Sequence, residues 1–338
     1  MGIEEGGDAS AARRPAIPQR DYTVTRDSSM EGIPFEAIDS LVPKLAEGEI
    51  VPSAEFHAEH RGNSKREILA TARAAIERAP SDRPRKAIIL AAGECTDIPL
   101  RELAEDSRLD EITLVDIDRR GVEEAVRGLP LHYRRKIKIV TADLTGIGGE
   151  LVSAVTALES REPKPSKLDF LRGIKKIVDG LRVRGRGPEL GGDYAFVCSQ
   201  LVMSRLESMP KRFLETAIAR TTGLVLSSIP GKPAGELISA LDELSESLQT
   251  EHIEYLAGLV SPLGGVHLAD TYEVSMPSGG WYKEPIPVVA MEAISQTASR
   301  HFADLRPQVF WQWGRKGANK IFQVFSRSLQ PKLQEASV

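Results

Sequence analysis

The segment Ala87–Asp97, with the sequence AIILAAGECTD, constrains the fold of this chain more than any other. It opens with a short apolar run rich in β-branched isoleucine, which is typical of a strand buried on both faces of a parallel sheet. The run ends at the small residues Ala91–Gly93, where a ligand could approach the backbone and where glycine permits a positive φ. Asp97 and Pro99 then favour the start of a short helix. A strand, a tight loop and a helix start together predict a nucleotide-type pocket at the carboxyl end of the strand.

The same loop lacks two common phosphate-binding motifs. A dinucleotide fingerprint reads G-x-G-x-x-G, whereas only Gly93 is present here, and the phosphate loop G-x-x-x-x-G-K-[ST] is absent from the sequence. Glu94, next to this glycine, would repel a phosphate. We therefore expect a nucleoside-like ligand that carries positive charge and no phosphate.

Composition limits the class of protein. The 338 residues suffice for one large domain or for a domain with an appendage, and the formal net charge of -4 gives no general attraction to nucleic acid or membranes. The two cysteines, Cys95 and Cys198, lie far apart and predict a reducing compartment without a disulfide framework. The N-terminus lacks a signal-peptide core and the sequence lacks a long apolar segment, so a soluble, cytoplasmic protein is expected.

Three regions are predicted along the chain. Residues 1–33 are polar and rich in Gly, Ala and Arg, which indicates a disordered tail. Residues 34–84 are expected to form an N-terminal helical cap, in which a capping box at Ser64–Glu67 starts the main helix. Residues 85–330 alternate between strands and helices, with an insertion at about 159–192.

Seven strands are predicted in the third region. They are expected at Ala87–Ala91, Glu111–Ile117, Lys136–Ala142, Tyr194–Ser199, Gly223–Ser228, Gly265–Ser275 and Asn319–Ser328. Helical patterns separate the first five, which indicates a parallel sheet, and a long loop joins the last two, which indicates an antiparallel last strand. The expected fold class is therefore α/β, a doubly wound, mostly parallel seven-stranded sheet with an N-terminal helical cap.

Two aspartates follow predicted strands at the edge where the loop lies. Asp116 comes about 20 residues after the glycine loop, where a carboxylate can accept both hydroxyls of a ribose. A helix N-cap is the alternative role, for which Asp118 is better placed. Asp143 ends the third strand and is either an acceptor for the amine of an adenine or a turn residue.

Four short motifs, LAAGECTD, LVDID, TADL and FVCSQL, occur in an order that resembles the class I S-adenosylmethionine-dependent methyltransferases. The resemblance covers Ala87 to Leu329. The loop departs from the commoner E-x-G-x-G-x-G and looks more like a bacterial subset that reads roughly G-x-G-N-C-N-D, a GxCxD-type loop. The resemblance implies a Rossmann-like sheet, S-adenosylmethionine as the cofactor, and methyl transfer by in-line displacement, to which the protein mainly contributes proximity.

The resemblance also implies which residues face the cofactor. Asp116 would hold the ribose and Asp143 the adenine end, while Gly93 would face the methionine part. Ser199 and Gln200 would line the gap that faces the transferable methyl group. The complete set expected to bind the cofactor is Ala92, Gly93, Glu94, Asp97, Asp116, Ile117, Asp143, Leu144 and Ser199.

Two polar segments outside these motifs are predicted to contact the substrate. The stretch around His57 and His60 could fold over the pocket mouth, with a histidine as general base, or could be a solvated loop. Two histidines do not make a metal site, so no metal is expected. The aromatic pair after Gly279-Gly280 could cap the pocket or anchor a long loop. The predicted catalytic residues are His57 and His60, and the predicted substrate-binding residues are Arg61, Asn63, Gln200, Trp281 and Tyr282.

Two tryptophans and two cysteines are expected to serve packing. Trp311 and Trp313 are interpreted as residues that pack the edge of the sheet, with stacking on a base as the alternative. Cys95 and Cys198 have no neighbouring base in the sequence and are expected to be buried and inert.

The sequence therefore predicts an enzyme, a methyltransferase that acts on an O or N nucleophile of a small-molecule metabolite. The fourth strand is followed by SQLV and not by the N/D-P-P-Y motif of enzymes that methylate amino groups of nucleic-acid bases. Three alternatives stay open: an aminopropyl- or aminocarboxypropyl-type transferase with a related cofactor, a nucleotide-dependent oxidoreductase, and a non-catalytic S-adenosylmethionine-binding protein. The expected partner is a small-molecule substrate, without a membrane or nucleic acid, and a homodimer is left open.

Overall fold

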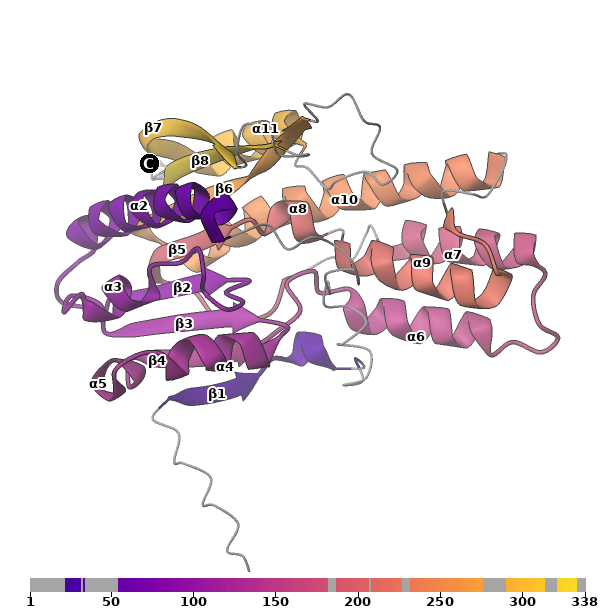
Figure 1. The fold of residues 1–338 in the computed structure, drawn as a ribbon, viewed down its shortest axis with the longest axis horizontal. Coiled ribbons are helices and arrows are strands. Elements are labelled where there is room, and N and C mark those ends of the chain that lie inside the picture. Colours follow the sequence, from indigo (N-terminus) through magenta and orange to yellow (C-terminus); the bar gives the residue numbers. More distant parts are fainter. Residues whose placement is uncertain are drawn as a thin grey trace, which may run out of the picture.

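The chain folds around one eight-stranded sheet (Figure 1). The computed structural model describes residues 22–31, 33, 54–181, 187–206, 208–226, 232–275, 290–313 and 321–332. The strands are β1 (Thr23–Arg26), β2 (Lys86–Leu90), β3 (Glu111–Asp116), β4 (Ile137–Thr141), β5 (Tyr194–Gln200), β6 (Val260–Ser275), β7 (Phe302–Trp313) and β8 (Ile321–Pro331). The helices are η1 (Ser28–Met30, a 3-10 helix), α2 (Ala54–Arg78), α3 (Leu100–Glu105), α4 (Arg119–Arg127), α5 (Leu131–Arg134), α6 (Gly148–Glu159), α7 (Lys167–Leu181), α8 (Met203–Leu206), α9 (Ser208–Thr222), α10 (Lys232–Leu259) and α11 (Met291–His301).

The strand order is β1-β4-β3-β2-β5-β6-β8-β7. Neighbouring strands are parallel from β1 to β6, and β8 is antiparallel to both β6 and β7. The predicted fold class, a doubly wound and mostly parallel sheet with an antiparallel last strand, is confirmed. The order reverses between β2 and β5, and in such sheets ligands bind outside the carboxyl ends of the strands at this switch point.

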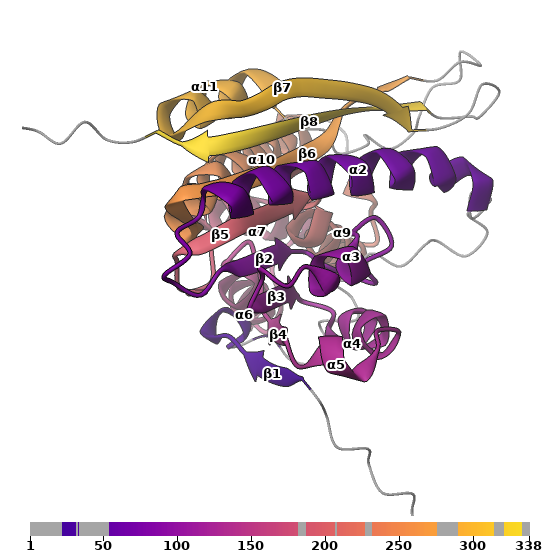
Figure 2. The same cartoon turned by 90° about the vertical axis from the view of Figure 1, so that its left-hand side faces the viewer.

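Helices cover both faces of the sheet, which explains why its strands read as continuous apolar runs. In β2, Ala87 and Ile89 belong to a core shared with α2, α3 and α4, while Ile88 and Leu90 belong to the core on the other side. Figure 2 shows α2 running along one face, with α10 and α7 on the far side. Beyond the carboxyl ends of the strands, α6, α7, α9 and α10 extend as a helical lobe (Figure 1).

Among the described residues, the strand that follows β5 in the chain is β6, so the strand predicted at Gly223–Ser228 is wrong. The described residues of that segment, 223–226, contain no strand. Gly223 takes a φ of 71° and its N–H donates to the carbonyl of Ala219, which ends α9 in the manner of a left-handed C-terminal cap. Leu226 then turns into the core while Val225 stays 60% exposed. An apolar run after a helix was thus mistaken for a strand.

Both edges of the sheet differ from the prediction. Strand β1 lies within residues 1–33, the predicted disordered tail, and pairs in parallel with β4. The predicted long loop between the last two strands contains α11 and the edge strand β7. An edge strand is exposed and tolerates polar residues and proline, so the segment FADLRPQVFWQW lacks a clear strand pattern.

Helix α2 is longer at its N-terminal end than the capping box predicted. It runs over Ala54–Arg78, so Ser64 and Glu67 lie in its interior and do not cap its start. His57, His60, Arg61 and Asn63 accordingly lie on a helix and not in a loop.

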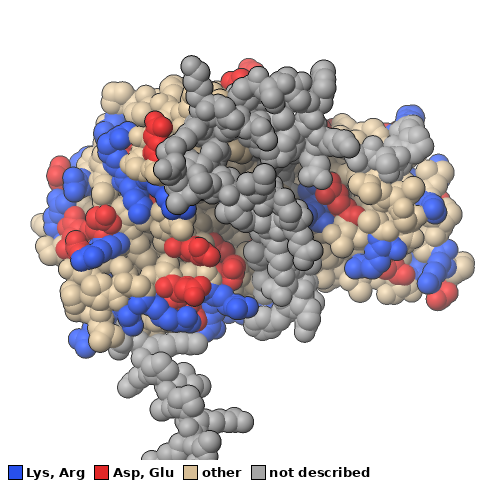
Figure 3. Space-filling view, in the orientation of Figure 1, with Lys and Arg blue, Asp and Glu red and all other residues tan. Residues whose placement is uncertain are grey.

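The charged residues are mixed in sign on the face shown in Figure 3, where Lys and Arg alternate with Asp and Glu over the described surface. None of the helices within the described residues combines the length and apolar character that crossing a membrane requires.

Candidate functional site

The loop after β2 has a tightly coiled backbone although it contains one glycine. Ala91, Gly93 and Cys95 take φ values of 48°, 49° and 54°, so every second residue is left-handed. Each non-glycine residue with a left-handed backbone conformation costs on the order of 1–2 kcal/mol of conformational energy. Such strain persists only where the surroundings enforce it, and it clusters at ligand-binding sites. The loop therefore keeps a glycine-type conformation with alanine and cysteine in place of two glycines.

Backbone and core contacts hold this loop. The N–H of Ala92 donates to the carbonyl of Val115 at 3.0 Å, and the N–H of Cys95 donates to the carbonyl of Ala92 at 2.9 Å. Cys95 is buried in the core beneath the loop, and burial raises the pKa of its thiol to about 12. Cys95 and Cys198 are both buried and unbridged, and burial also raises the pKa of Cys198. The prediction that both cysteines serve packing is confirmed.

We expect Ala91→Gly to raise the free energy of unfolding by up to about 1 kcal/mol, because relief of a left-handed alanine exceeds the entropy that glycine adds to the unfolded chain. Ala92→Gly is the matched control, since Ala92 is buried and has no positive φ. The same change there should lower the free energy of unfolding by about 0.5–1 kcal/mol. Urea denaturation measures both variants, and shifts of the same sign would contradict the strain assigned to Ala91.

Asp116 ties the end of β3 to this loop. Its Oδ2 accepts a hydrogen bond from the N–H of Gly93 at 2.8 Å, and its Oδ1 accepts one from the N–H of Asp118 at 2.8 Å. The side chain is half-buried, and burial raises its pKa although the two N–H groups act in the opposite direction. A carboxylate has about four lone-pair positions, so about two remain for ligand hydroxyls. Asp118 is the N-cap of α4 and accepts from the N–H of Arg120, as predicted.

Asp97 does not cap α3, contrary to the sequence prediction. The N-cap position is Pro99, without a side-chain hydrogen bond, and Asp97 instead faces α2. Its Oδ2 lies 3.7 Å from His60 Nε2 and its Oδ1 lies 3.7 Å from Arg61 Nε. Burial favours the neutral form, but the contact with His60 and the charges of Arg61 and Arg205 outweigh it and hold the pKa of Asp97 below its usual value. Asp97 is therefore a fixed anion at the end of the loop.

The carboxylate of Asp143 accepts hydrogen bonds from the turn that follows it in the chain. Its side chain is buried, Oδ1 accepts from the N–H and the hydroxyl of Thr145 at 2.9 and 2.7 Å, and Oδ2 accepts from the N–H of Gly148 at 2.8 Å. A Cβ at Gly148 would lie 2.7 Å from this Oδ2, so glycine allows α6 to start against the carboxylate. Burial raises the pKa of Asp143 against these hydrogen bonds. Of its two possible roles, the contacts favour the turn residue, and the adenine contact stays a prediction.

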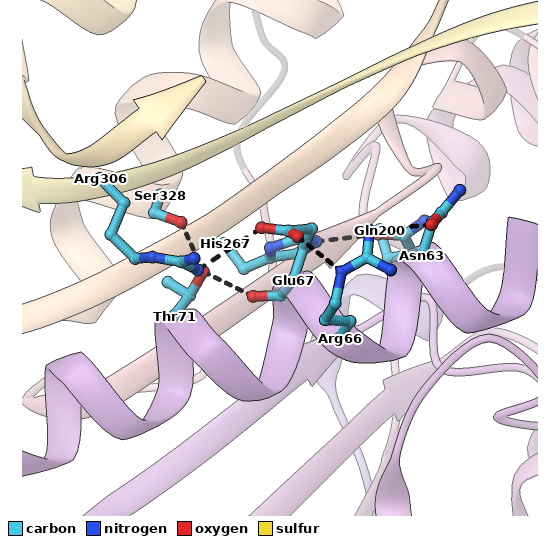
Figure 4. Close-up of polar contacts among 8 residues, drawn as sticks. All are labelled: Asn63, Arg66, Glu67, Thr71, Gln200, His267, Arg306 and Ser328. Atoms are coloured by element: carbon cyan, nitrogen blue, oxygen red, sulfur yellow. Dashed lines mark hydrogen bonds and ion pairs between the residues drawn. The ribbon is translucent and has the colours of Figure 1, made fainter. Parts of the chain in front are cut away.

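Ser199 and Gln200 lie on opposite faces of β5, so they do not line one gap together. Ser199 Oγ lies 2.9 Å from Nε2 of His252 on α10. Gln200 faces α2, where its Nε2 donates to Ser64 Oγ at 3.0 Å. Its Oε1 accepts from Nε2 of His267 at 2.9 Å (Figure 4). Adjacent residues of a strand point to opposite faces. Ser199 thus contacts the helical layer that contains α10, and Gln200 contacts α2 on the other face of the sheet.

The polar residues of α2 contact the C-terminal strands. His60 is fully buried, and its Nδ1 accepts a hydrogen bond from Trp311 Nε1 at 3.0 Å. His57 Nδ1 accepts one from Trp313 Nε1 at 3.1 Å. Burial and the charge of Arg61 lower the pKa of His57. The two tryptophans do lie on the edge strand, as expected, and also reach across to the helix.

Further along α2, a second set of polar contacts reaches β7 and β8 (Figure 4). Asn63 Oδ1 accepts from Arg66 Nη2 at 2.8 Å on the exposed side of the helix. Glu67, which is buried, lies between Arg66 and Arg306, with N–O distances of 3.2 and 3.4 Å. Of these, the Glu67–Arg306 pair joins α2 to β7, and a 2.6 Å hydrogen bond between the hydroxyls of Thr71 and Ser328 joins α2 to β8.

The remaining predicted site residues are distributed as follows. Glu94 is exposed on the loop, and Ile117 packs beside Met30 and Met209. Leu144 packs against the core on the side of α6. Trp281 and Tyr282 lie outside the described residues. Asp116 thus contacts the loop at Gly93, and Asp97 lies at the end of that loop, whereas Ile117 packs elsewhere. That these residues bind a cofactor stays a prediction.

Sequence reasoning missed Asp270, which lies in β6 beyond the register of Gln200. It is fully buried, and its carboxylate accepts from the N–H groups of Ser204 at 3.1 Å and Thr271 at 2.7 Å. Burial raises its pKa to about 6 despite these hydrogen bonds and the charge of Arg205. The signal was available, since an aspartate within an apolar strand marks a specific polar role.

No protein-family model matches the chain, and no curated protein matches it. Similar solved structures include an S-adenosylmethionine-dependent methyltransferase from Leishmania major, at 10% identity over 87% of this chain and 82% of that chain, with a TM-score of 0.40. TYW2 from M. jannaschii, in complex with AdoMet, is similar at 11% identity over 86% of this chain and 82% of that chain, with a TM-score of 0.34. The cyclase SpnF is similar at 8% identity over 78% of this chain and 80% of that chain, with a TM-score of 0.39.

Proposed function

We propose that this chain is an enzyme that binds S-adenosylmethionine at the carboxyl edge of β2 and β3 and transfers its methyl group to an O or N nucleophile of a small-molecule metabolite. The observation that carries the proposal is the hydrogen bond from the N–H of Gly93 to Asp116. It joins a left-handed loop to a half-buried carboxylate beside the switch point of a doubly wound sheet. This is the place and the chemistry that a nucleoside ligand requires.

The residues at this edge fit a cationic, unphosphorylated nucleoside. Asp116 has lone pairs left for the two ribose hydroxyls, and the tightly coiled backbone at Gly93 allows close approach of the methionine part. Asp97 stays ionised beside the loop and Glu94 is exposed on it, which favours a ligand with ammonium and sulfonium groups over a phosphate. These three carboxylates therefore suit the cationic S-adenosylmethionine better than a dinucleotide, which carries phosphates.

Methyl transfer from this cofactor makes few demands on the protein. When bound, the cofactor supplies an electrophilic methyl group that carries its own leaving group. The residues of the chain then have to hold the nucleophile in line with that methyl group and to exclude water, which is catalysis by proximity and orientation. Asp116 and the Gly93 loop fix the ribose and the methionine part, and Asp97 adds a fixed negative charge beside them.

Calorimetric titration of the purified protein with S-adenosylmethionine tests the proposal, followed by incubation with labelled cofactor and a pool of small metabolites. We expect a Kd in the micromolar range and label in a small molecule, with S-adenosylhomocysteine as the second product. A folded wild type that does not bind the cofactor would overturn the proposal. Release of methylthioadenosine would identify an aminocarboxypropyl-type transferase, and its release only when decarboxylated S-adenosylmethionine is supplied would identify an aminopropyl-type one. Binding without turnover would identify a binding protein.

A further inference from the structure

We propose that Trp311 and Trp313 act as positioning residues that fix the tautomers of His60 and His57. Both histidines then carry their proton on Nε2, and the N–H of His60 faces Ser64 Oγ, with Asp97 at the end of the loop after β2 next to it. The tautomer part of this inference stands on hydrogen bonds alone. Its consequence for ligand binding rests on the proposed function.

The direction of the two hydrogen bonds follows from the chemistry of indole. The indole N–H is a donor and has no acceptor capacity, so the imidazole nitrogen facing it must offer a lone pair. Trp311 Nε1 lies 3.0 Å from His60 Nδ1, and Trp313 Nε1 lies 3.1 Å from His57 Nδ1. A neutral imidazole has one acceptor and one donor nitrogen. The proton of each ring is therefore on Nε2.

The surroundings of His60 agree with this tautomer. Its Nε2 lies 3.4 Å from Ser64 Oγ and 3.7 Å from Asp97 Oδ2, both of which can accept a hydrogen bond. Ser64 Oγ already accepts from Gln200 Nε2 at 3.0 Å. The ring of Trp313 stacks on His60 with centroids 4.2 Å apart and an angle of 16° between the planes, which fixes the ring orientation. A second proton at Nδ1 would face the indole N–H of Trp311.

This arrangement changes the role expected of the two histidines. A general base needs a free lone pair, and the lone pairs of His57 and His60 are used by the two indoles. His60 Nε2 instead faces Ser64 Oγ and lies 3.7 Å from Asp97, whose other oxygen faces Arg61. Among the described residues, the charged groups that act on His57 and Asp97 are Asp97 itself from the loop, Arg61 from α2 and Arg205 from α8. Residues 251 positions apart in the sequence thus connect strand β7 to the proposed cofactor loop.

Nitrogen NMR of the full-length chain labelled with ¹⁵N-histidine tests the inference without any ligand. The chain has six histidines, so the ring signals are few, and His60→Gln assigns the His60 pair. We expect the wild type at neutral pH to show a protonated Nε2 and a hydrogen-bonded, unprotonated Nδ1 for His60. A protonated Nδ1 in the wild type would overturn the proposal, whatever the variants do.

Two matched variants test which tryptophan fixes which histidine. Trp311→Phe keeps an aromatic ring but removes the N–H, so His60 should lose its single-tautomer pattern while His57 keeps its own. Trp313→Phe should produce the converse, and it also serves if Trp311→Phe fails to fold. An unchanged pattern at the paired histidine in a folded variant would overturn the proposal. Because these spectra need no cofactor, failure to bind S-adenosylmethionine would refute the proposed function alone.

Discussion

Asp116→Asn will weaken the binding of S-adenosylmethionine by roughly 100-fold or more, because hydrogen bonds to a charged acceptor contribute about 1.5–3 kcal/mol each and a ribose can donate two. The substitution replaces one carboxylate oxygen by an NH₂ group. That group would face the N–H of Gly93 or the N–H of Asp118, both of which now donate at 2.8 Å. Calorimetric titration of the variant beside the wild type measures the change in Kd.

Asp118→Asn is the matched control for this experiment. It makes the same chemical change two residues along, at a side chain that caps α4 through the N–H of Arg120. Asparagine is as good an N-cap as aspartate, so the control should keep both its stability and its affinity for the cofactor. Equal losses in the two variants would mean that the general charge of this edge matters and that Asp116 has no specific role. Thermal unfolding followed by circular dichroism checks that both variants are folded.

Strands β2 to β5 of the parallel part were predictable because each is a mostly apolar run buried on both faces of the sheet, whereas the exposed strand β1 was missed. The segment LAAGECTD, with Gly93 at its centre, also predicted the tight loop that follows β2. The failures have local causes. A left-handed Gly223 ends α9, so the apolar residues after it form no strand, and the exposed edge strand β7 has no regular pattern. At Ser64, a capping box occurs inside a helix that has already begun.

The candidate site was predictable to the extent that it depends on strand ends. Asp116 and Gly93 follow neighbouring strands of one edge, and the hydrogen bond between them is the expected consequence. The opposite orientations of Ser199 and Gln200 were also predictable, because adjacent residues of a strand point to opposite faces. The family motif alone does not carry this information. The pairing of His60 with Trp311 was not predictable, because no local pattern links two segments so distant in sequence.

Asp143→Ala will lower the free energy of unfolding by about 3 kcal/mol, because it leaves several buried donors without an acceptor, each costing about 1–3 kcal/mol. The donors are the N–H and hydroxyl of Thr145 and the N–H of Gly148. Part of the cost is recovered, since burial disfavours the charge of Asp143. Urea denaturation measures the change. Asp118→Ala is the control, an exposed helix cap whose loss should cost about 0.5–2 kcal/mol.

The same variant decides between the two roles of Asp143. If the carboxylate holds the turn before α6, Asp143→Ala loses stability, yet its affinity for S-adenosylmethionine, measured well below the unfolding midpoint, stays within about threefold of the wild type. If the carboxylate instead accepts the amine of the adenine, the affinity falls by about tenfold, the value of one hydrogen bond to a charged group, while stability changes little. The hydrogen bonds to Thr145 and Gly148 leave the carboxylate buried and engaged, so the first outcome is expected. Of the two aspartates predicted to contact the nucleoside, Asp116 and Asp143, only Asp116 would then bind the cofactor directly.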